Sequence, residues 1–119
     1  MDRETVEDYV EEMKDVEGIR AILLYGSRVE GRVHERSDWD ICLVAPDRDS
    51  WEVVKDAWQV TGAREEVDIH TFKELTLQIK KRIIDNHEVL WKEEGFRIGE
   101  YFVKFRRMWK DTAKARGVS

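Results

Sequence analysis

Two short motifs, Gly26-Ser27 and Asp38-Trp39-Asp40, lie between two apolar segments and constrain the fold more than any other feature of the chain. Residues 19–25 and 39–45 are rich in apolar and β-branched side chains, which is typical of buried strands. Glycine allows a tight turn and a close approach of the backbone to a ligand. Ser27 is expected to cap a short helix over 27–33, whose free amides would bind an anion. The sequence thus predicts a strand, a ligand-binding turn and a second strand.

The second strand begins with two carboxylates, Asp38 and Asp40. Residues two apart on a strand point to the same face and stand about 7 Å apart. Two carboxylates at this separation repel each other unless a cation lies between them. A divalent metal ion bound to a nucleotide, such as magnesium, is the natural candidate for this cation. Trp39 lies between the two acids and must point to the opposite face, where we expect a core position.

The remaining elements follow from the spacing of apolar residues, which recur at three and four in helices and at two in strands. We expect helices over 2–15, 48–61, 73–84 and 97–115, strands over 64–72 and 88–91, a polar loop over 34–37 and a turn over 85–87. Alternating helices and strands indicate an α/β fold with helices packed on a small mixed sheet, plus a C-terminal helix.

Apolar stripes on the first and last helices indicate which faces are buried. The first helix carries Val6, Tyr9, Val10 and Met13, and the last carries Tyr101, Phe102, Phe105, Met108 and Trp109. The tryptophans at 51, 58, 91 and 109 are also interpreted as core residues rather than as platforms for base stacking.

A third carboxylate is expected from the strand over 64–72. Asp68 is the preferred candidate, because it opens the apolar-flanked segment Asp68-Ile69-His70. Glu66 lies two residues earlier on the same face and is the alternative.

With 119 residues the chain is long enough for one domain, with a core over about 1–92 and the C-terminal helix over about 96–115. The net charge of −5 argues against general nucleic-acid binding. Residues 1–17 hold eight acids and residues 101–116 hold six bases, so the two ends either attract each other or serve different partners.

The single cysteine, Cys42, lies in the second strand and is expected to be buried, which agrees with a reducing compartment. The sequence shows no cationic leader and no apolar run of membrane-spanning length. We therefore expect a cytoplasmic protein with no membrane association.

Gly26-Ser27, a gap of ten residues and then Asp38-x-Asp40 resemble the nucleotidyltransferase signature of the DNA polymerase β superfamily. The similarity is greatest to the minimal nucleotidyltransferases of the HEPN/MNT antitoxin type. Their pattern Gly-Ser-x-Ala-x-Gly is met except that Val29 replaces alanine, a change in volume that touches no polar role. The resemblance implies the polymerase β-like nucleotidyltransferase fold.

The resemblance also implies a two-metal mechanism. Asp38 and Asp40 would hold two Mg²⁺ ions, and Asp68 would complete the second site and accept a proton. Gly26, Ser27 and Arg28 would contact the phosphates of ATP or another nucleoside triphosphate. Whether magnesium or manganese is used, and which base is preferred, stay open.

Other polar residues near the motifs have two interpretations. Arg28 and Arg36 either contact phosphate or are solvated surface residues, and His34 has the same ambiguity. His70 shares a face with Asp68 and either touches the acceptor or has a structural role, which we favour. His87 is interpreted as a turn residue.

The favoured function is transfer of a nucleoside monophosphate, AMP above all, to a hydroxyl of a partner protein. The resemblance implies a HEPN-type toxin as that partner, with this chain as the antitoxin. One alternative is a binding protein that neutralises its partner by contact and keeps a vestigial nucleotide site. Another is transfer to a small molecule or to an RNA end, although nucleic acid is not an expected partner. A homo-oligomer is left open.

Overall fold

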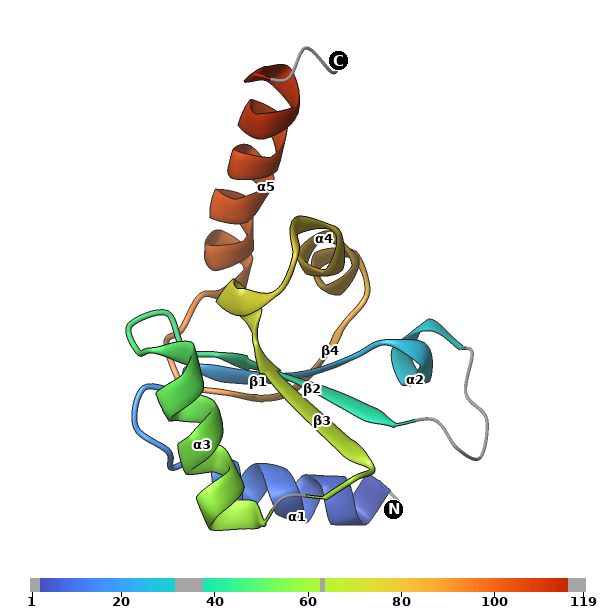
Figure 1. Cartoon of the computed structure of the whole chain (residues 1–119), viewed down its shortest axis with the longest axis vertical. Coiled ribbons are helices and arrows are strands. Elements are labelled where there is room, and N and C mark those ends of the chain that lie inside the picture. The colour runs from blue at the N-terminus through green and yellow to red at the C-terminus, as the bar shows by residue number, and fades with distance from the viewer. Residues whose placement is uncertain (1–2, 32–37, 63, 116–119) are drawn as a thin grey trace.

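The computed structural model describes residues 3–31, 38–62 and 64–115, apart from the side chains at 109 and 111–115. Its four strands form one sheet in the order β3-β2-β1-β4 (Figure 1). Strand β1 (Ala21–Tyr25) pairs antiparallel with β2 (Trp39–Val44) and with β4 (Glu88–Lys92), whereas β3 (Val67–Thr71) runs parallel to β2. The predicted small mixed sheet is confirmed.

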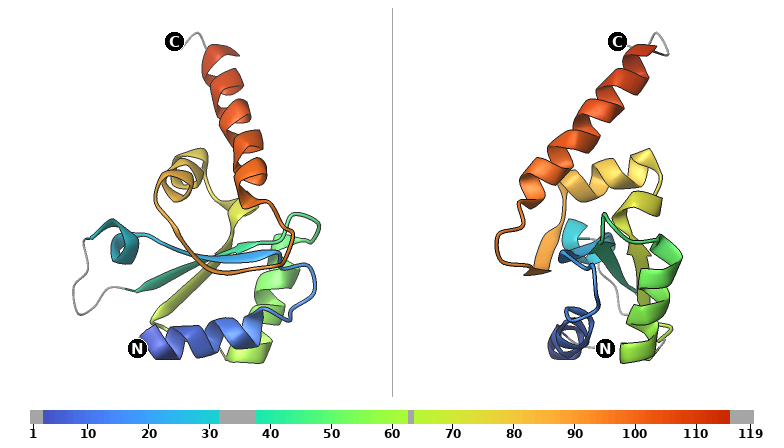
Figure 2. Two further views of the ribbon diagram at one scale, coloured as in Figure 1. Left: turned by 180° about the vertical axis from the view of Figure 1, so that it is seen from behind. Right: turned by 90° about the vertical axis from the view of Figure 1, so that its left-hand side faces the viewer.

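Helices cover both faces of this sheet. Helices α1 (Arg3–Met13) and α3 (Ser50–Thr61) lie on one face, and α4 (Leu77–Asp85) and α5 (Ile98–Ala115) lie on the other (Figures 1 and 2). A single turn, α2 (Ser27–Glu30), follows β1, and the 3₁₀ turn η1 (Phe72–Glu74) follows β3. The acidic α1 and the basic α5 therefore lie on opposite sides of the sheet and do not pack together.

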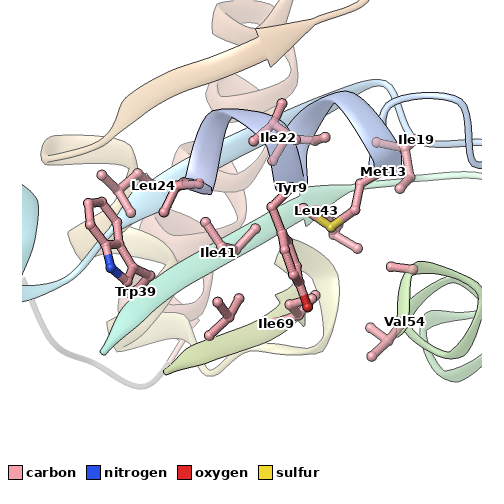
Figure 3. Close-up of a cluster of buried hydrophobic side chains, with 14 of the residues drawn as sticks. Tyr9, Met13, Ile19, Ile22, Leu24, Trp39, Ile41, Leu43, Val54 and Ile69 are labelled. Carbon is pink, nitrogen blue, oxygen red and sulfur yellow. The ribbon is translucent and has the colours of Figure 1, made fainter. Parts of the chain in front are cut away.

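The alternation of side chains along β2 divides the interior into two clusters. Ile41 and Leu43 point toward α1 and α3 (Figure 3), whereas Cys42 and Val44 point toward α4 and α5. All four side chains are almost fully buried, and the burial of Cys42 matches the sequence prediction. The predicted stripe of α1 is also buried, and it consists of Val6, Tyr9, Val10 and Met13.

Two tryptophans predicted as core residues lie on the surface instead. The side chains of Trp51 and Trp58 are 61% and 36% exposed and pack against each other edge to face at 5.9 Å. Helix α3 buries Val53, Val54 and Ala57. The prediction failed because the smaller residues already fill the space above the sheet, so that α3 is rotated away from the face expected from the tryptophan spacing.

Helix starts also differ from the predicted bounds. Helix α3 begins at Ser50 rather than 48, because the side chain of Asp49 accepts a hydrogen bond from the Glu52 amide and caps the helix. The predicted helix over 73–84 is divided into η1 and α4, since Thr76 caps α4 through the Ile79 amide. The predicted loop over 34–37 lies outside the described residues.

Helix α5 is attached to the body through an aromatic cluster centred on Phe72. The Phe72 ring lies 5.2 Å from Phe102 and 4.9 Å from Phe105, measured between ring centres, and its side chain is fully buried. The distal part of α5 extends beyond the sheet (Figure 1). Accordingly, Met108 is 50% exposed although its position suggested burial, and the Trp109 side chain is outside the described residues.

Within the described part of the chain, no helix combines the length and apolar character that crossing a membrane requires.

Replacing Phe72 with alanine should lower the free energy of unfolding by about 3–5 kcal/mol, because it removes the aromatic ring that joins η1 to α5. The exposed Trp51→Ala change should cost far less, although it removes a larger side chain. Urea unfolding of both variants measures the difference, and similar losses would contradict the assigned core.

Candidate active site

Two of the predicted acids stand side by side in the sheet. Asp40 of β2 and Asp68 of β3 are register partners in the parallel pair. Both alternate with residues of the α1 and α3 cluster, which places their side chains on the sheet face covered by α4. From the sequence, their proximity was predicted only because the two strands were expected to be neighbours in the sheet.

A cavity of about 460 Å³ lies between this end of the sheet, the turn of α2 and helix α4. The strands and the turn provide polar walls, and α4 provides a largely aliphatic one. The described lining residues are Tyr25, Gly26, Ser27, Glu30, Asp40, Asp68, His70, Leu75, Ile79, Arg82, Ile83 and Asn86. The cavity therefore contains predicted acids and the predicted glycine-serine turn.

Gly26 is required by the geometry of this turn. Its φ is +82°, and a Cβ built there would come within 2.2 Å of Asp40 Oδ2. Glycine thus permits the backbone to pass directly beside the carboxylate. Ser27 does not cap the helix as predicted: Gly26 occupies the cap position, and no side chain caps α2. The helix is also shorter than predicted, because Gly31 ends it in the left-handed conformation at φ 78°.

Asp40 carries the electrostatic cost of the arrangement. Its carboxyl is half-buried, and its pKa is raised above the usual 3.8, first by desolvation and then by the neighbouring carboxylates of Asp68 and Asp38. His70 and Arg28 act in the opposite direction without offsetting this effect. An added cation at the carboxylates would remove the repulsion.

The carboxylate of Asp68 is held by a histidine. His70 Nε2 lies 3.0 Å from Asp68 Oδ1, and His70 Nδ1 lies 3.3 Å from Glu74 Oε1. Glu74 Oε1 also accepts a hydrogen bond from the Thr71 amide at 2.9 Å. His70 thereby orients Asp68, which agrees with the structural role favoured from the sequence. The rival acid, Glu66, precedes β3, is exposed and is not among the described residues lining the cavity.

Asp38 and Arg28 lie at the edge of the site. Asp38 is exposed and directly precedes β2, close enough to Asp40 to affect its pKa. The Arg28 guanidinium stacks 3.9 Å from the ring centre of Trp39, and its Nε donates to the Asp38 backbone carbonyl at 3.3 Å. Trp39 is buried on the α1 side of the sheet, as predicted (Figure 3). His34 and Arg36 lie outside the described residues.

Sequence reasoning missed the contribution of α4. Arg82 lines the cavity and pairs with Glu30 of α2 at 2.9 Å, so this pair joins the two elements on either side of the cavity. No local motif marks Arg82, because it lies more than forty residues from the acidic motif. Leu75, Ile79 and Ile83 add an aliphatic part to the wall of the cavity. Tyr25 was read only as part of a strand; burial raises the pKa of its phenol, which stays protonated.

The carboxylates of the cavity are suitable ligands for a divalent cation, although they are not arranged as a complete coordination site. Among the residues that the structure describes, no three His, Cys, Asp or Glu side chains form a ready-made metal site. Asp68 is instead engaged by His70, and Asp40 carries the repulsion described above. Hard carboxylate oxygens are the ligands that Mg²⁺ prefers, and Asp40 and Asp68 present them on adjacent strands.

Comparison with known proteins places this site in a family. Residues 5–95 match the family described as polymerase beta, nucleotidyltransferase. A protein of Methanocaldococcus jannaschii, named for a presumed protein adenylyltransferase activity, is 42% identical over 94 residues, which are 78% of this chain and 71% of that protein. The chain therefore belongs to the polymerase β nucleotidyltransferase family and is a nucleotidyltransferase.

Solved structures with low sequence identity share the fold. A chain in the crystal structure of a toxin–antitoxin with AMP-PNP is 20% identical, with a TM-score of 0.67, over 98% of this chain and 94% of that one. A chain in the complex of a tri-AMPylated Shewanella oneidensis HEPN toxin with its MNT antitoxin is 19% identical, with a TM-score of 0.61, over 93% and 89% of the two chains. The polymerase β-like fold expected from the sequence is confirmed.

Gly26→Ala should disrupt the site, whereas Gly31→Ala should cost only backbone strain. Both glycines have positive φ, but a Cβ at Gly31 meets no atom of the described residues within 4 Å. The strain of alanine in this conformation is about 1 kcal/mol for each, so a larger loss of stability at Gly26 reports the collision with Asp40. Thermal unfolding compares the two variants, and equal losses would contradict the close approach.

Asp40→Asn should stabilise the metal-free protein at neutral pH. Because the folded state raises the pKa of Asp40, the wild-type chain loses stability as the pH rises from 3.8 through that raised value. The variant escapes this loss, so it should melt at a higher temperature than wild type at pH 7 and at a similar temperature near pH 3. Thermal unfolding across this pH range is the measurement, with the exposed Asp8→Asn as control. A variant less stable than wild type at pH 7 would refute the assigned repulsion.

Proposed function

We propose that this chain transfers AMP from ATP to a hydroxyl of a partner protein of the HEPN family and thereby acts as an antitoxin. The observation that carries the proposal is the juxtaposition of Asp40 and Asp68 beside the Gly26 turn in one cavity. The M. jannaschii relative, 42% identical, supports a protein as acceptor, and the complex with a tri-AMPylated HEPN toxin supports its class.

The carboxylates would serve as the catalytic centre. Asp38, Asp40 and Asp68 would hold two Mg²⁺ ions. When bound, these ions would neutralise charge on the triphosphate and lower the pKa of the acceptor hydroxyl. To take part, Asp68 must loosen its contact with His70. Its carboxylate would accept the proton of the attacking hydroxyl, the acceptor oxygen would bond to the α-phosphorus, and the bond to the β-phosphate oxygen would break to release pyrophosphate.

The other walls would bind and orient the nucleotide. Gly26 and Ser27 line the cavity where the phosphates would approach, and the missing side chain at Gly26 leaves room beside this turn for the Asp40 carboxylate. Arg82 is the only Lys or Arg among the described lining residues, so it is the candidate to meet the triphosphate after leaving Glu30. The aliphatic wall of α4 would contact the nucleoside.

Arg28 would assist from outside the cavity. It stacks on Trp39 and contacts the backbone of Asp38, so we assign it to holding the acidic motif rather than to direct phosphate binding. This differs from the role that the resemblance implied, and the choice between the two roles rests on the placement of its guanidinium.

The proposal predicts a mass gain of one or more AMP units on a purified HEPN-family protein incubated with this chain, ATP and Mg²⁺. Asp40→Asn and Asp68→Asn should each slow the transfer about a hundredfold or more, because they remove charge stabilisation that matters most in the transition state. Glu66→Gln is the matched control and should leave the rate near wild type. Intact-protein mass spectrometry measures all three variants.

Three results would overturn the proposal. Complex formation without a mass gain would favour the contact-neutralising alternative, and label transferred from ATP to RNA or to a small molecule would favour the other acceptors. A rate loss in Glu66→Gln with Asp68→Asn unaffected would move the third carboxylate to Glu66.

A further inference from the structure

Helix α4 separates the nucleotide cavity from a second hollow on the molecule. Ile79, Arg82 and Ile83 face the cavity, whereas Leu77, Ile84 and their neighbours face a groove of about 210 Å³ between α4 and α5. A helix is about 10 Å across. A molecule bound in the groove would therefore lie about one helix diameter from the reacting groups.

The floor of this α4–α5 groove is apolar. It is formed by Leu77 and Ile84 of α4 and by Phe105 of α5. The Phe105 ring packs edge-on against Phe72 at 4.9 Å between ring centres, so the floor belongs to the core that holds α5 in place. A groove with such a floor offers a fixed apolar surface to a side chain inserted from outside.

The rim of the groove is basic although the chain as a whole carries a net charge of −5. Lys80, Lys81, Arg106 and Lys110 surround the floor, with Asp85 as the one acid among the described lining residues. Arg106 lies 3.8 Å from Asp85, which leaves the rim with a clear excess of positive charge. An apolar floor with a basic rim is complementary to an amphipathic acidic segment.

Lys80 has a setting suited to a carboxylate partner. Its Nζ lies 5.0 Å from the Phe105 ring centre and 5.9 Å from that of Phe72. Burial lowers the pKa of Lys80, and no carboxylate of the described residues contributes to its shift. A carboxylate placed over the groove would offset the desolvation of this ammonium group.

A second copy of the chain fits the groove poorly. Its acidic α1 offers carboxylates, but the apolar stripe of that helix, centred on Tyr9 and Met13, is buried in its own core. RNA also fits less well, because the floor has two aliphatic side chains and its single ring is already packed against Phe72 and Lys80. Base stacking needs an open aromatic face.

We propose that the α4–α5 groove docks an acidic, amphipathic segment of the acceptor protein, with an apolar side chain on Leu77, Ile84 and Phe105 and carboxylates on the basic rim. This inference rests on the proposed function, because it assigns the docking site of the same protein substrate. Docking there presents the acceptor across α4 from the nucleotide cavity.

Two matched charge reversals on α5 test the groove. Arg106→Glu/Lys110→Glu changes the rim, and Lys104→Glu/Arg107→Glu makes the same change of residue types on a part of α5 that does not line the groove. The rim pair should weaken binding of a purified HEPN-family protein at least about tenfold in calorimetry and raise the KM for that protein. ATP affinity should stay within about twofold in both pairs, and acceptor binding should stay within about twofold in the control pair.

The corresponding glutamine pairs guard against misfolding caused by a new acid beside Asp85. Arg106→Gln/Lys110→Gln should give a smaller loss in the same direction, with a wild-type melting temperature. The docking site would be overturned if the rim pair and the control pair lost acceptor binding equally, or if neither pair lost any. A rim pair that loses binding of a single-stranded RNA oligonucleotide but retains the acceptor would also overturn it.

Failure of the groove and failure of the proposed function are distinguishable. If the acceptor protein binds the wild-type chain more tightly than the rim pair, but the wild-type chain transfers no AMP, the docking site is retained and the transfer reaction is rejected. Wild-type transfer with an unchanged KM in the rim pair would reject the docking site and retain the reaction.

Discussion

Asp40 and Asp68 lie side by side on two parallel strands, and the rest of the site is arranged around the cost of keeping a charge on Asp40 in this half-buried place. The fold holds Asp40 half-buried, where desolvation and its neighbours disfavour the charge that it must carry to bind a cation. His70 contacts the carboxylate of Asp68, and Gly26 gives the backbone room beside Asp40. A site that is strained without its ligand is pre-arranged to gain stability when the ligand binds.

The two-sided sheet explains how so short a chain supports such a site. The α1 and α3 face supplies a continuous core that fixes β2 and β3, while the α4 face leaves the ends of these strands open to a cavity. Helix α4 then serves two surfaces, since one side lines the cavity and the other lines the α4–α5 groove. In this proposal the nucleotide binds on one side of α4 and the acceptor protein docks on the other side.

Much of the fold was predictable because its signals are local. The alternation in β3 and the stripe of α1 place residues such as Ile69 and Val6 without any tertiary information. The rotation of α3 was not predictable, since Trp51 and Val54 both satisfy helical spacing and only packing density selects between them. For the site, Gly26 and Asp40 were candidates because of motif spacing, and Asp68 because of its place on a neighbouring strand. Arg82 reaches the cavity only through the placement of α4 and leaves no sequence signal.

A cation bound at Asp40 would offset the cost that burial and the neighbouring carboxylates place on its charge, and a carbon-13 NMR titration of the aspartate side-chain carboxyls measures this effect. Asp40 should titrate above its usual pKa of 3.8 in the free protein, and Mg²⁺ with a non-hydrolysable ATP analogue should move this transition to lower pH. An Asp40 transition at the usual value, or one that Mg²⁺ and the nucleotide analogue leave unchanged, would contradict this expectation.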